Sequence, residues 1–599
     1  MKCAHGMPFG AECRDGATRF RLWAPSCGRV GLELGREQKR SLPMDPLHDG
    51  WHELVVEGVG HGAAYMFRCG ELLVPDPASR ANPWDVAGPS VVVDPRRYEW
   101  QDDAWKGLPW HEAVVYELHL GTFTPEGTLR AAASKLEHLA RAGITAVEVM
   151  PVAEFAGQRG WGYDGVLPFA PESAYGSPED LKGFVQSAHE LRLMVLLDVV
   201  YNHFGPEGNH LGSYAKDFFN PAHQTPWGAA INFDGPGART VRDFFIHNAL
   251  YWIDEYRFDG LRLDAVHAIR DESPVHIVEE IAQAVARGPG RERHVHIVLE
   301  NDGNCARLIE RGARAQWNDD AHHGLHVLLT GERDGYYADY AADAPRLLGR
   351  ALAEGFSWQG EPSAHRAGAP RGEPSKHLPL TAFMPFLQNH DQVGNRAMGE
   401  RLSVLAAPER VQLAMAMLLL APSVPLLFMG DEFAARTPFL YFCDFKGELA
   451  DAVREGRRRE FASFARFADE RARAAIPDPN DARTFVASRL DWDSLVQPGH
   501  AASFEHFKRL THLRASVIVP RLAKGEAHGT FTSSPPGLVC VDWTLGEGSR
   551  LHLRANLSDG PGECAAPEGR LLHVEGTAPE AGRIGPWSAA WWLLDVKGG

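Results

Sequence analysis

Short apolar runs alternate with longer amphipathic segments from about residue 110 to residue 450, and this rhythm constrains the fold more than any other feature. Residues 128–142 illustrate the helical part, because Leu129, Leu136 and Leu139 fall on one face at helical spacing. Strands that alternate with helices indicate a parallel sheet. Eight such units predict a closed (β/α)8 TIM barrel, an α/β fold, with insertions. The predicted strands are Val114–Leu120, Ala146–Pro151, Met194–Val200, Gly260–Val266, Val295–Glu300, Ala313–Trp317, Ala382–Gln388 and Val424–Phe428.

The segments on either side of the barrel have a different rhythm. Before it, short alternating strands are separated by Gly, Pro and Asp turns, which is typical of a β-sandwich. After about residue 517 the pattern returns to strands, which predicts a small antiparallel β domain of sandwich type. We therefore predict an N-terminal β-sandwich over 1–105, a barrel over 106–516 and the antiparallel domain over 517–599. Two stretches are too long for plain connections and are predicted insertions of the barrel, at 203–240 and 319–381.

The overall charge argues against two classes of partner. The formal net charge is -17, and an acidic excess repels nucleic acid phosphates and anionic lipid headgroups. The longest apolar run is shorter than the roughly 18 residues of a membrane span, and the first residues show no apolar signal core. Eight scattered cysteines without zinc-binding spacing indicate reduced thiols. We expect a cytoplasmic protein that binds neither nucleic acid nor membrane.

Acidic residues stand at the ends of several predicted barrel strands, where active sites of this fold lie. Asp198, Asp264, Glu300 and Asp391 each follow or end an apolar run, with His or Arg close by. Arg262 and Asp264 are two positions apart on one strand, so both side chains point toward the barrel axis. A neighbouring guanidinium keeps a carboxylate ionised, and an ionised carboxylate is what a nucleophile needs.

Two carboxyl groups on either side of a glycosidic bond are the minimum for glycoside hydrolysis. Strands lie about 4.8 Å apart, so Asp264 and Glu300 on adjacent strands favour the short separation of a retaining enzyme. An apolar strand mouth can raise the pKa of Glu300, which suits a proton donor. Asp391 is placed to stabilise positive charge on the sugar, and His203 and His390 are placed to bind sugar hydroxyls.

Four stretches around these residues resemble the signature stretches of the α-amylase superfamily, glycoside hydrolase family 13. The resemblance implies that Asp264 is the nucleophile, Glu300 the general acid/base and Asp391 the stabiliser of the transition state. It further implies that the sugar being cleaved contacts Tyr163, His203, Arg262 and His390, with the tyrosine stacking on it. The N-terminal sandwich resembles the glycogen-binding-like domain of branching and debranching members. The four stretches are Asp198–His203, Gly260–Val266, Leu299–Asp302 and Gln388–Asp391.

Longer segments resemble one branch of that superfamily, whose members act on maltooligosyl trehalose. The resemblance implies hydrolysis of the α-1,4 bond next to the terminal α,α-trehalose unit, releasing trehalose and a maltooligosaccharide. It also implies that the enzyme works alongside a maltooligosyl trehalose synthase. For recognition of the trehalose end we predict His267, Asp319, Asp320 and His323. The segments are Tyr116–Gly127, Tyr201–Asn209, Leu263–Ile269, Gln316–His323 and Gln388–Arg396.

The sequence is compatible with several alternatives. A 1,4-α-glucan branching or debranching enzyme would share the acids and the N-terminal domain, whereas a catalytically dead glucan-binding scaffold would not need the intact acids. Asp198 and Asn202 could ligate calcium or could orient the site by hydrogen bonds. The pair His322 and His323 favours a hydroxyl-binding or structural role over a metal cluster. We therefore predict no metal and no cofactor, and we leave open whether the N-terminal domain binds glucan or braces the barrel.

Overall fold

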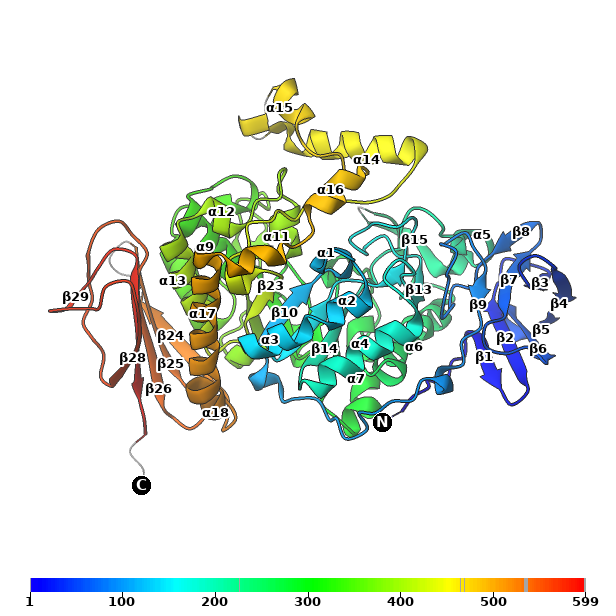
Figure 1. Ribbon diagram of the computed structural model, residues 1–599, viewed down its shortest axis with the longest axis horizontal. Helices are drawn as coiled ribbons and strands as arrows, with labels where there is room; N and C mark the ends of the chain where they lie inside the picture. Colours follow the sequence, from blue (N-terminus) through cyan, green and yellow to red (C-terminus); the bar gives the residue numbers. More distant parts are fainter. Residues whose placement is uncertain (1, 226, 464, 468, 533–536, 597–599) are drawn as a thin grey trace.

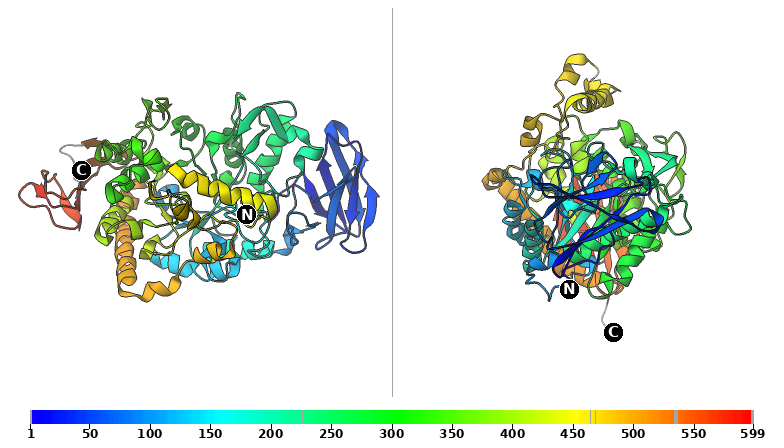
Figure 2. Two further views of the ribbon diagram at one scale, coloured as in Figure 1. Left: turned by 90° about the horizontal axis from the view of Figure 1, so that it is seen from above. Right: turned by 90° about the vertical axis from the view of Figure 1, so that its right-hand side faces the viewer.

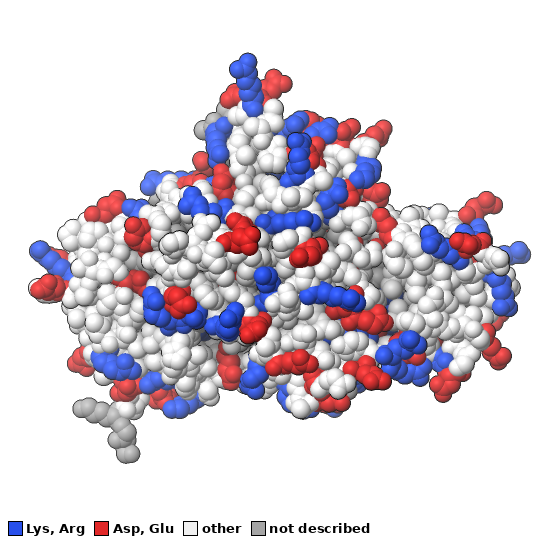
Figure 3. All heavy atoms as spheres, viewed as in Figure 1, with Lys and Arg blue, Asp and Glu red and all other residues white. Residues whose placement is uncertain are grey.

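The computed structural model describes residues 2–225, 227–463, 465–467, 469–532 and 537–596. Figure 1 shows a β-rich domain at each end of an elongated molecule, with the barrel and its helices between them. Among the described residues, none of the helices is both long enough and apolar enough to cross a bilayer. On the face shown in Figure 3, basic side chains are scattered among acidic ones rather than gathered in one patch.

The N-terminal domain is the predicted sandwich of two antiparallel sheets, and its core holds Phe20, Leu32 and Phe67. An ion pair ties it to the barrel, because Arg80 Nε lies 3.2 Å from Glu255 Oε1 and both side chains are buried. One sheet has the order β1 (Gly10–Arg14), β2 (Ala17–Trp23), β6 (Trp51–Glu57) and β5 (Asp45–Pro46). The other has the order β4 (Arg40–Pro43), β3 (Val30–Leu34), β7 (Ala64–Cys69) and β8 (Leu72–Val74), with β9 (Ser90–Val91) on β7.

The central domain is an eight-stranded parallel barrel, which a bridge between Phe386 and Leu426 closes. All eight predicted strands are confirmed. Most end sooner than predicted, and β17 and β18 stop directly before Asp264 and Glu300. In spatial order the strands are β22 (Phe383–Pro385), β19 (Ala315–Asn318), β18 (His296–Leu299), β17 (Gly260–Leu263), β14 (Met194–Val199), β11 (Ala146–Val149), β10 (Val115–Leu118) and β23 (Leu426–Phe428).

Helices surround the barrel, as its rhythm predicts (Figure 1). The helix predicted over 128–142 is interrupted, because the Ser134 hydroxyl donates to the Ala131 carbonyl (2.6 Å) and α2 ends there. The helix predicted at residue 178 is α4, which begins with a Ser177–Asp180 capping box. The helices are α1 (Leu120–Phe123), α2 (Leu129–Ala133), α3 (Leu136–Ala142), α4 (Pro178–Glu190), α6 (Ala238–Glu255), α7 (Ile277–Arg287), α8 (Ala306–Glu310), α11 (His390–Gly394), α12 (Leu402–Leu405) and α13 (Pro408–Leu419).

Three long excursions and one small hairpin leave the barrel. The segment 203–240 contains α5 (Leu211–Tyr214) and a hairpin of β15 (Phe219–Thr225) and β16 (Gly228–Ile231). A smaller hairpin before α4 pairs β12 (Ala153–Glu154) with β13 (Leu167–Pro171). The segment 319–381 contains α9 (Asp319–Thr330), α10 (Ala344–Glu354), β20 (Glu361–Pro362) and β21 (Pro370–Arg371). The third excursion is not predicted from the sequence and projects from the molecule in Figures 1 and 2 as α14 (Gly447–Glu460), α15 (Glu470–Ala474) and α16 (Ala482–Ala487).

The C-terminal domain confirms the predicted antiparallel fold. Its five-stranded sheet packs against α10, and the Trp543 indole donates to the Leu352 carbonyl at 2.8 Å. A helical segment leads into it through α17 (Pro498–Leu513), a π-helical turn (Arg514–Ile518) and α18 (Val519–Leu522). The sheet order is β24 (His528–Thr532), β25 (Leu538–Thr544), β26 (Arg550–Asn556), β30 (Ser588–Leu594) and β28 (Arg570–Glu575), beside a pair of β27 (Gly562–Glu563) and β29 (Arg583–Ile584).

Candidate active site

One buried arginine joins three acids at the carboxyl ends of the barrel strands. Arg262 Nη1 lies 2.8 Å from Asp264 Oδ1 and 2.6 Å from Asp198 Oδ2. Its Nη2 lies 3.0 Å from Glu300 Oε2. The guanidinium is fully buried and packs 4.1 Å above the centroid of the Trp317 ring. The predicted common direction of Arg262 and Asp264 is therefore confirmed, and it places the acids of neighbouring strands around one cation.

Asp264 is oriented through both of its carboxylate oxygens. Arg262 donates to Oδ1, and the Asn202 side-chain amide donates to Oδ2 at 2.8 Å. The next residue, Ala265, has a left-handed backbone (φ 40°), which is uncommon for a residue with a β-carbon. This turn directs the Ala265 N–H to Glu300 Oε2 at 2.7 Å. The strand end thus fixes Asp264 and Glu300 relative to each other, as a two-carboxylate reaction requires.

Glu300 has the environment of a proton donor. Burial raises its pKa well above the ordinary value, and the charge of Arg262 opposes this effect. The carboxylates of Asp264 and Asp391 raise the pKa further, because a second negative charge nearby is unfavourable. Burial therefore favours the protonated form of Glu300, while Asp264 beside it accepts hydrogen bonds from two donors. Two carboxyl groups with such different surroundings can serve as acid and nucleophile.

His390 and Tyr163 lie beside these acids and contact two of the aspartates, Asp391 and Asp198. Burial lowers the pKa of His390, but the charges of Asp391 and Glu117 outweigh it and raise the pKa to about 9. Its Nδ1 lies 2.5 Å from Glu117 Oε1, and its Nε2 lies 3.4 Å from Asp391 Oδ1. Tyr163 stacks on the same imidazole (5.1 Å between centroids) and donates to Asp198 Oδ2 at 2.7 Å. His390 is thus a cation at neutral pH beside the site.

The first excursion adds an aromatic wall that the sequence does not assign. Trp227, from the β15–β16 hairpin, lies parallel to the His203 ring with centroids 4.9 Å apart. Half of the Trp227 surface is exposed, so the indole can meet a ligand. Burial lowers the pKa of His203, whose Nδ1 contacts the Asn202 amide oxygen. His203 is therefore neutral and held in place, as expected of a group that binds a hydroxyl.

The predicted trehalose-recognition residues separate into two environments. His267 borders an open cleft of about 810 Å³ that also contains Asn301 and Gly303. Asp319 lies near the catalytic acids, and burial raises its pKa to about 7 against the opposing charge of Arg371. His323 is buried, burial lowers its pKa well below the usual value, and its Nδ1 has no hydrogen-bond partner among the described residues.

We predicted that Asp320 contacts the trehalose end of the substrate, but its side chain lies in a closed network of other residues. Its carboxylate is completely buried and accepts hydrogen bonds from Asn304 Nδ2 (2.8 Å) and the Ser357 backbone (2.6 Å). Arg371 Nη2 lies 3.1 Å away, and the Tyr340 hydroxyl donates to the same group. Both oxygens are occupied, so Asp320 holds the 319–381 excursion together rather than facing the cleft. Adjacent positions on a helix point about 100° apart, which explains why Asp319 and Asp320 differ.

The residues considered as metal ligands make other contacts. Asn202 donates to Asp264 and its oxygen contacts His203, so this side chain orients the site. His322 contacts the Leu387 carbonyl at 2.6 Å and the Tyr337 hydroxyl at 3.1 Å through its two nitrogens. These contacts favour the orienting and structural roles that the sequence left open.

Three contributors to the site, Glu117, Trp317 and Trp227, are not predicted from the sequence. Glu117 holds His390 through the side chain at 2.5 Å and through the backbone N–H at 2.9 Å. Trp317 packs under Arg262. Glu117 stands two positions after the interior residue Val115, so strand alternation could have identified it as an inward-facing acid. The position of Trp227 depends on the path of a long excursion, which no local pattern predicts.

Comparisons with known proteins place each domain. The model "Alpha amylase, catalytic domain" matches residues 95–249, and "Carbohydrate-binding module 48 (Isoamylase N-terminal domain)" matches residues 8–77. Residues 528–591 match "Domain of unknown function (DUF3459)". The sandwich, barrel and C-terminal sheet therefore each correspond to a known domain family.

Whole-chain relatives are more specific. A crystal structure of a Salmonella typhimurium protein described as an alpha amylase is 44% identical, covers 98% of this chain and 100% of its own, and has a TM-score of 0.92. A branching enzyme from Streptomyces coelicolor is 37% identical over 271 residues, only 42% of this chain and 36% of the enzyme. The malto-oligosyltrehalose trehalohydrolase of Deinococcus radiodurans is 40% identical over 582 residues, 95% of this chain and 93% of the relative. At that identity along nearly its whole length, the chain belongs to the malto-oligosyltrehalose trehalohydrolase family of the α-amylase superfamily.

Proposed function

We propose that this protein hydrolyses the α-1,4 bond next to the terminal α,α-trehalose unit of maltooligosyl trehalose and retains the anomeric configuration. The observation that carries the proposal is the position of Arg262 between Asp198, Asp264 and Glu300. This arrangement sets a hydrogen-bonded carboxylate beside a carboxylic acid of raised pKa. The names of the full-length relatives support the substrate.

The first half of the reaction uses these two groups in opposite roles. Asp264 attacks the anomeric carbon of the maltooligosyl part, while Glu300 gives its proton to the departing oxygen. The bond between the anomeric carbon and that oxygen breaks, trehalose leaves, and the sugar stays esterified to Asp264. Asp391, with the His390 cation at 3.4 Å, is placed to stabilise the positive charge that develops on the ring.

The second half reverses the roles. The Glu300 carboxylate, now without its proton, takes a proton from a water molecule that attacks the same anomeric carbon. The ester bond to Asp264 breaks, and the maltooligosaccharide leaves with its original configuration. Because Glu300 acts as acid and then as base, both of its protonation states are needed, and Arg262 at 3.0 Å supports the charged one.

Recognition of the trehalose end is proposed for the cleft beyond Glu300. The cleft contains His267. Asp319 lies near the catalytic acids, and His323 is buried further along the same helix, α9. Trehalose differs from maltose in its linkage and in having no reducing end, so discrimination must come from hydroxyl positions. A buried polar group that loses its hydroxyl partner costs binding energy, which allows such groups to reject maltose.

The deciding experiment compares maltotriosyl trehalose with maltopentaose, with the products separated by chromatography. We expect free trehalose from the first and slow or no cleavage of the second, while Asp264→Asn, the matched control, releases no product. Equal cleavage of both sugars would reduce the proposal to a general α-glucosidase. Transfer products without new reducing ends would instead favour a branching enzyme.

We further propose that the enzyme works after a maltooligosyl trehalose synthase, because some enzyme must form the 1,1-linkage before this one cleaves beside it. A cytoplasmic location is also proposed. It is supported by the eight cysteines, all of which are free thiols. Coexpression of the two enzymes on a maltooligosaccharide should yield trehalose, and omission of either should abolish it.

A further inference from the structure

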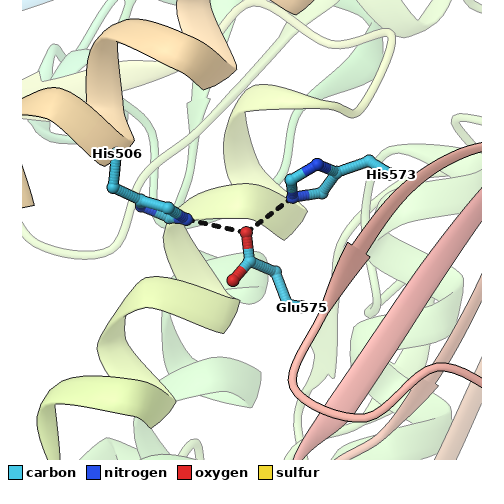
Figure 4. A group of neighbouring side chains, drawn as sticks. All are labelled: His506, His573 and Glu575. Atoms are coloured by element: carbon cyan, nitrogen blue, oxygen red, sulfur yellow. Dashed lines mark hydrogen bonds and ion pairs between the residues drawn. The ribbon is translucent and has the colours of Figure 1, made fainter.

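Two histidines and one glutamate converge where the C-terminal domain meets the barrel domain. His506 lies on α17, and His573 and Glu575 lie on β28. Figure 4 shows both imidazoles pointing at the same carboxylate. His506 Nε2 lies 2.7 Å from Glu575 Oε1, and His573 Nε2 lies 2.6 Å from the same oxygen. One ligand atom from each residue lies within 4.8 Å of the other two.

The positions of the strand and the helix bring these three side chains together. His573 and Glu575 are two positions apart, so they share one face of the strand. The helix brings the third side chain from a segment more than sixty residues earlier in the chain. The His573 ring also rests near the Trp591 ring, with centroids 5.6 Å apart, which limits its movement. Three donor atoms therefore meet at one point from two domains.

We propose that His506, His573 and Glu575 form a binding site for one divalent cation of a late first-row transition metal, with zinc as the representative ion. Two imidazoles and one carboxylate are a ligand set that zinc accepts, with one position left for water. Imidazole ligands favour zinc, copper or nickel over calcium and magnesium, which prefer oxygen. The site lies far along the chain from the strand-end acids and takes no part in the proposed sugar chemistry.

Binding needs only a small adjustment of these side chains. Zinc ligands lie about 2.0–2.2 Å from the ion, so tetrahedral neighbours are about 3.4 Å apart. The two Nε2–Oε1 separations must therefore widen by less than about 1 Å, which side-chain rotation of the glutamate can supply. The side chains of His506, His573 and Glu575 are 12%, 23% and 13% exposed, so an ion can enter. His506 also lines a cavity of about 180 Å³ between α13 and α17, which offers room for water.

The consequence of occupancy is a link between domains. Without the ion, one hydrogen bond, between His506 and Glu575, joins α17 to β28, while His573 contacts the same oxygen from within β28. With it, coordinate bonds would hold the same two elements. An ion that binds the folded state stabilises that state. Zinc is therefore expected to raise the melting temperature of the full chain.

The test uses the full-length protein, freed of metal by chelation, dialysed against zinc and analysed for metal content. We expect one zinc per chain, and cobalt in its place should give the visible absorption of a four-coordinate ion. His573→Ala and Glu575→Gln should each weaken zinc binding by more than about tenfold, since even outer-shell partners of a metal cost that much. Neither variant should change sugar hydrolysis.

His377→Ala is the matched control. His377 also pairs with a glutamate, at 2.5 Å from Glu310, but no second histidine of the described chain contacts that oxygen. This variant should keep the wild-type zinc content and the zinc-dependent rise in melting temperature. The proposal is overturned if the wild type retains no zinc, or if His573→Ala and Glu575→Gln bind zinc as the wild type does.

Discussion

The barrel mouth and the 319–381 excursion contribute to the same site in different ways. At the mouth, Asp264 and Glu300 are fixed by strand ends and share one guanidinium. On the excursion, the neighbours Asp319 and Asp320 face different surroundings, one beside the catalytic acids and one inside its own loop. The mouth thus holds its acids around one shared cation, whereas the excursion, for which we propose a role in recognition, places its two neighbouring acids in different surroundings.

The largest expected effect tests the mouth directly. Asp264→Asn keeps the size of the side chain but removes the nucleophile, so we expect kcat to fall by about 10⁴-fold or more. The measurement is trehalose release from maltotriosyl trehalose, with folding checked by circular dichroism. A variant that kept more than a tenth of the activity would show that Asp264 is not the nucleophile.

Arg262→Lys tests whether the shared guanidinium matters beyond its charge. A lysine ammonium cannot reach three carboxylates in the planar geometry that Arg262 uses. We expect kcat to fall by about 10²–10³-fold, comparable to the loss of one preorganised donor in other enzymes. KM should change less, because the guanidinium positions acids rather than the distant sugars. Near-normal kcat would mean that strand geometry alone positions the acids.

Strand geometry also explains how much of this site the sequence could predict. The alternation of side chains along residues 260–266 is a local property of one strand. The common direction of Arg262 and Asp264 could therefore be predicted from the sequence. The partner of His390 required knowing that β10 lies beside β23, which closes the barrel. Asp320 looked like its neighbour, because both are acids at the start of one helix. Only the folded path of residues 340–371 shows which one is enclosed.

The two neighbouring aspartates make a matched pair for stability. Asp320→Asn leaves the buried Arg371 without its charge partner, so we expect a loss of about 3 kcal/mol. Asp319 has a pKa raised to about 7, so the folded state binds its proton more tightly than the unfolded chain does. Wild-type stability should therefore fall as pH rises from about 3.9 toward 7.

Asp319→Asn removes that proton-linked loss. The variant should be more stable than the wild type at pH 8 and closer to it at pH 4, the opposite sign to Asp320→Asn. Urea unfolding at the two pH values measures the free energy of unfolding of both variants. Kinetics on maltotriosyl trehalose and maltopentaose separates an effect on recognition from an effect on folding. Equal destabilisation by both substitutions would erase the distinction between the two positions.

The smallest expected effect concerns the other excursion. Trp227 is half exposed and stacks on His203, so it can extend the aromatic surface available to the sugar without touching the acids. Removing it in Trp227→Ala should cost about 1 kcal/mol of binding, or roughly a fivefold rise in KM with kcat nearly unchanged. Trp227→Phe keeps a flat ring and should recover most of the loss. A fall in kcat instead would mean that the hairpin helps to orient His203 at the reacting sugar, and that an excursion shares the positioning role assigned above to the strand ends.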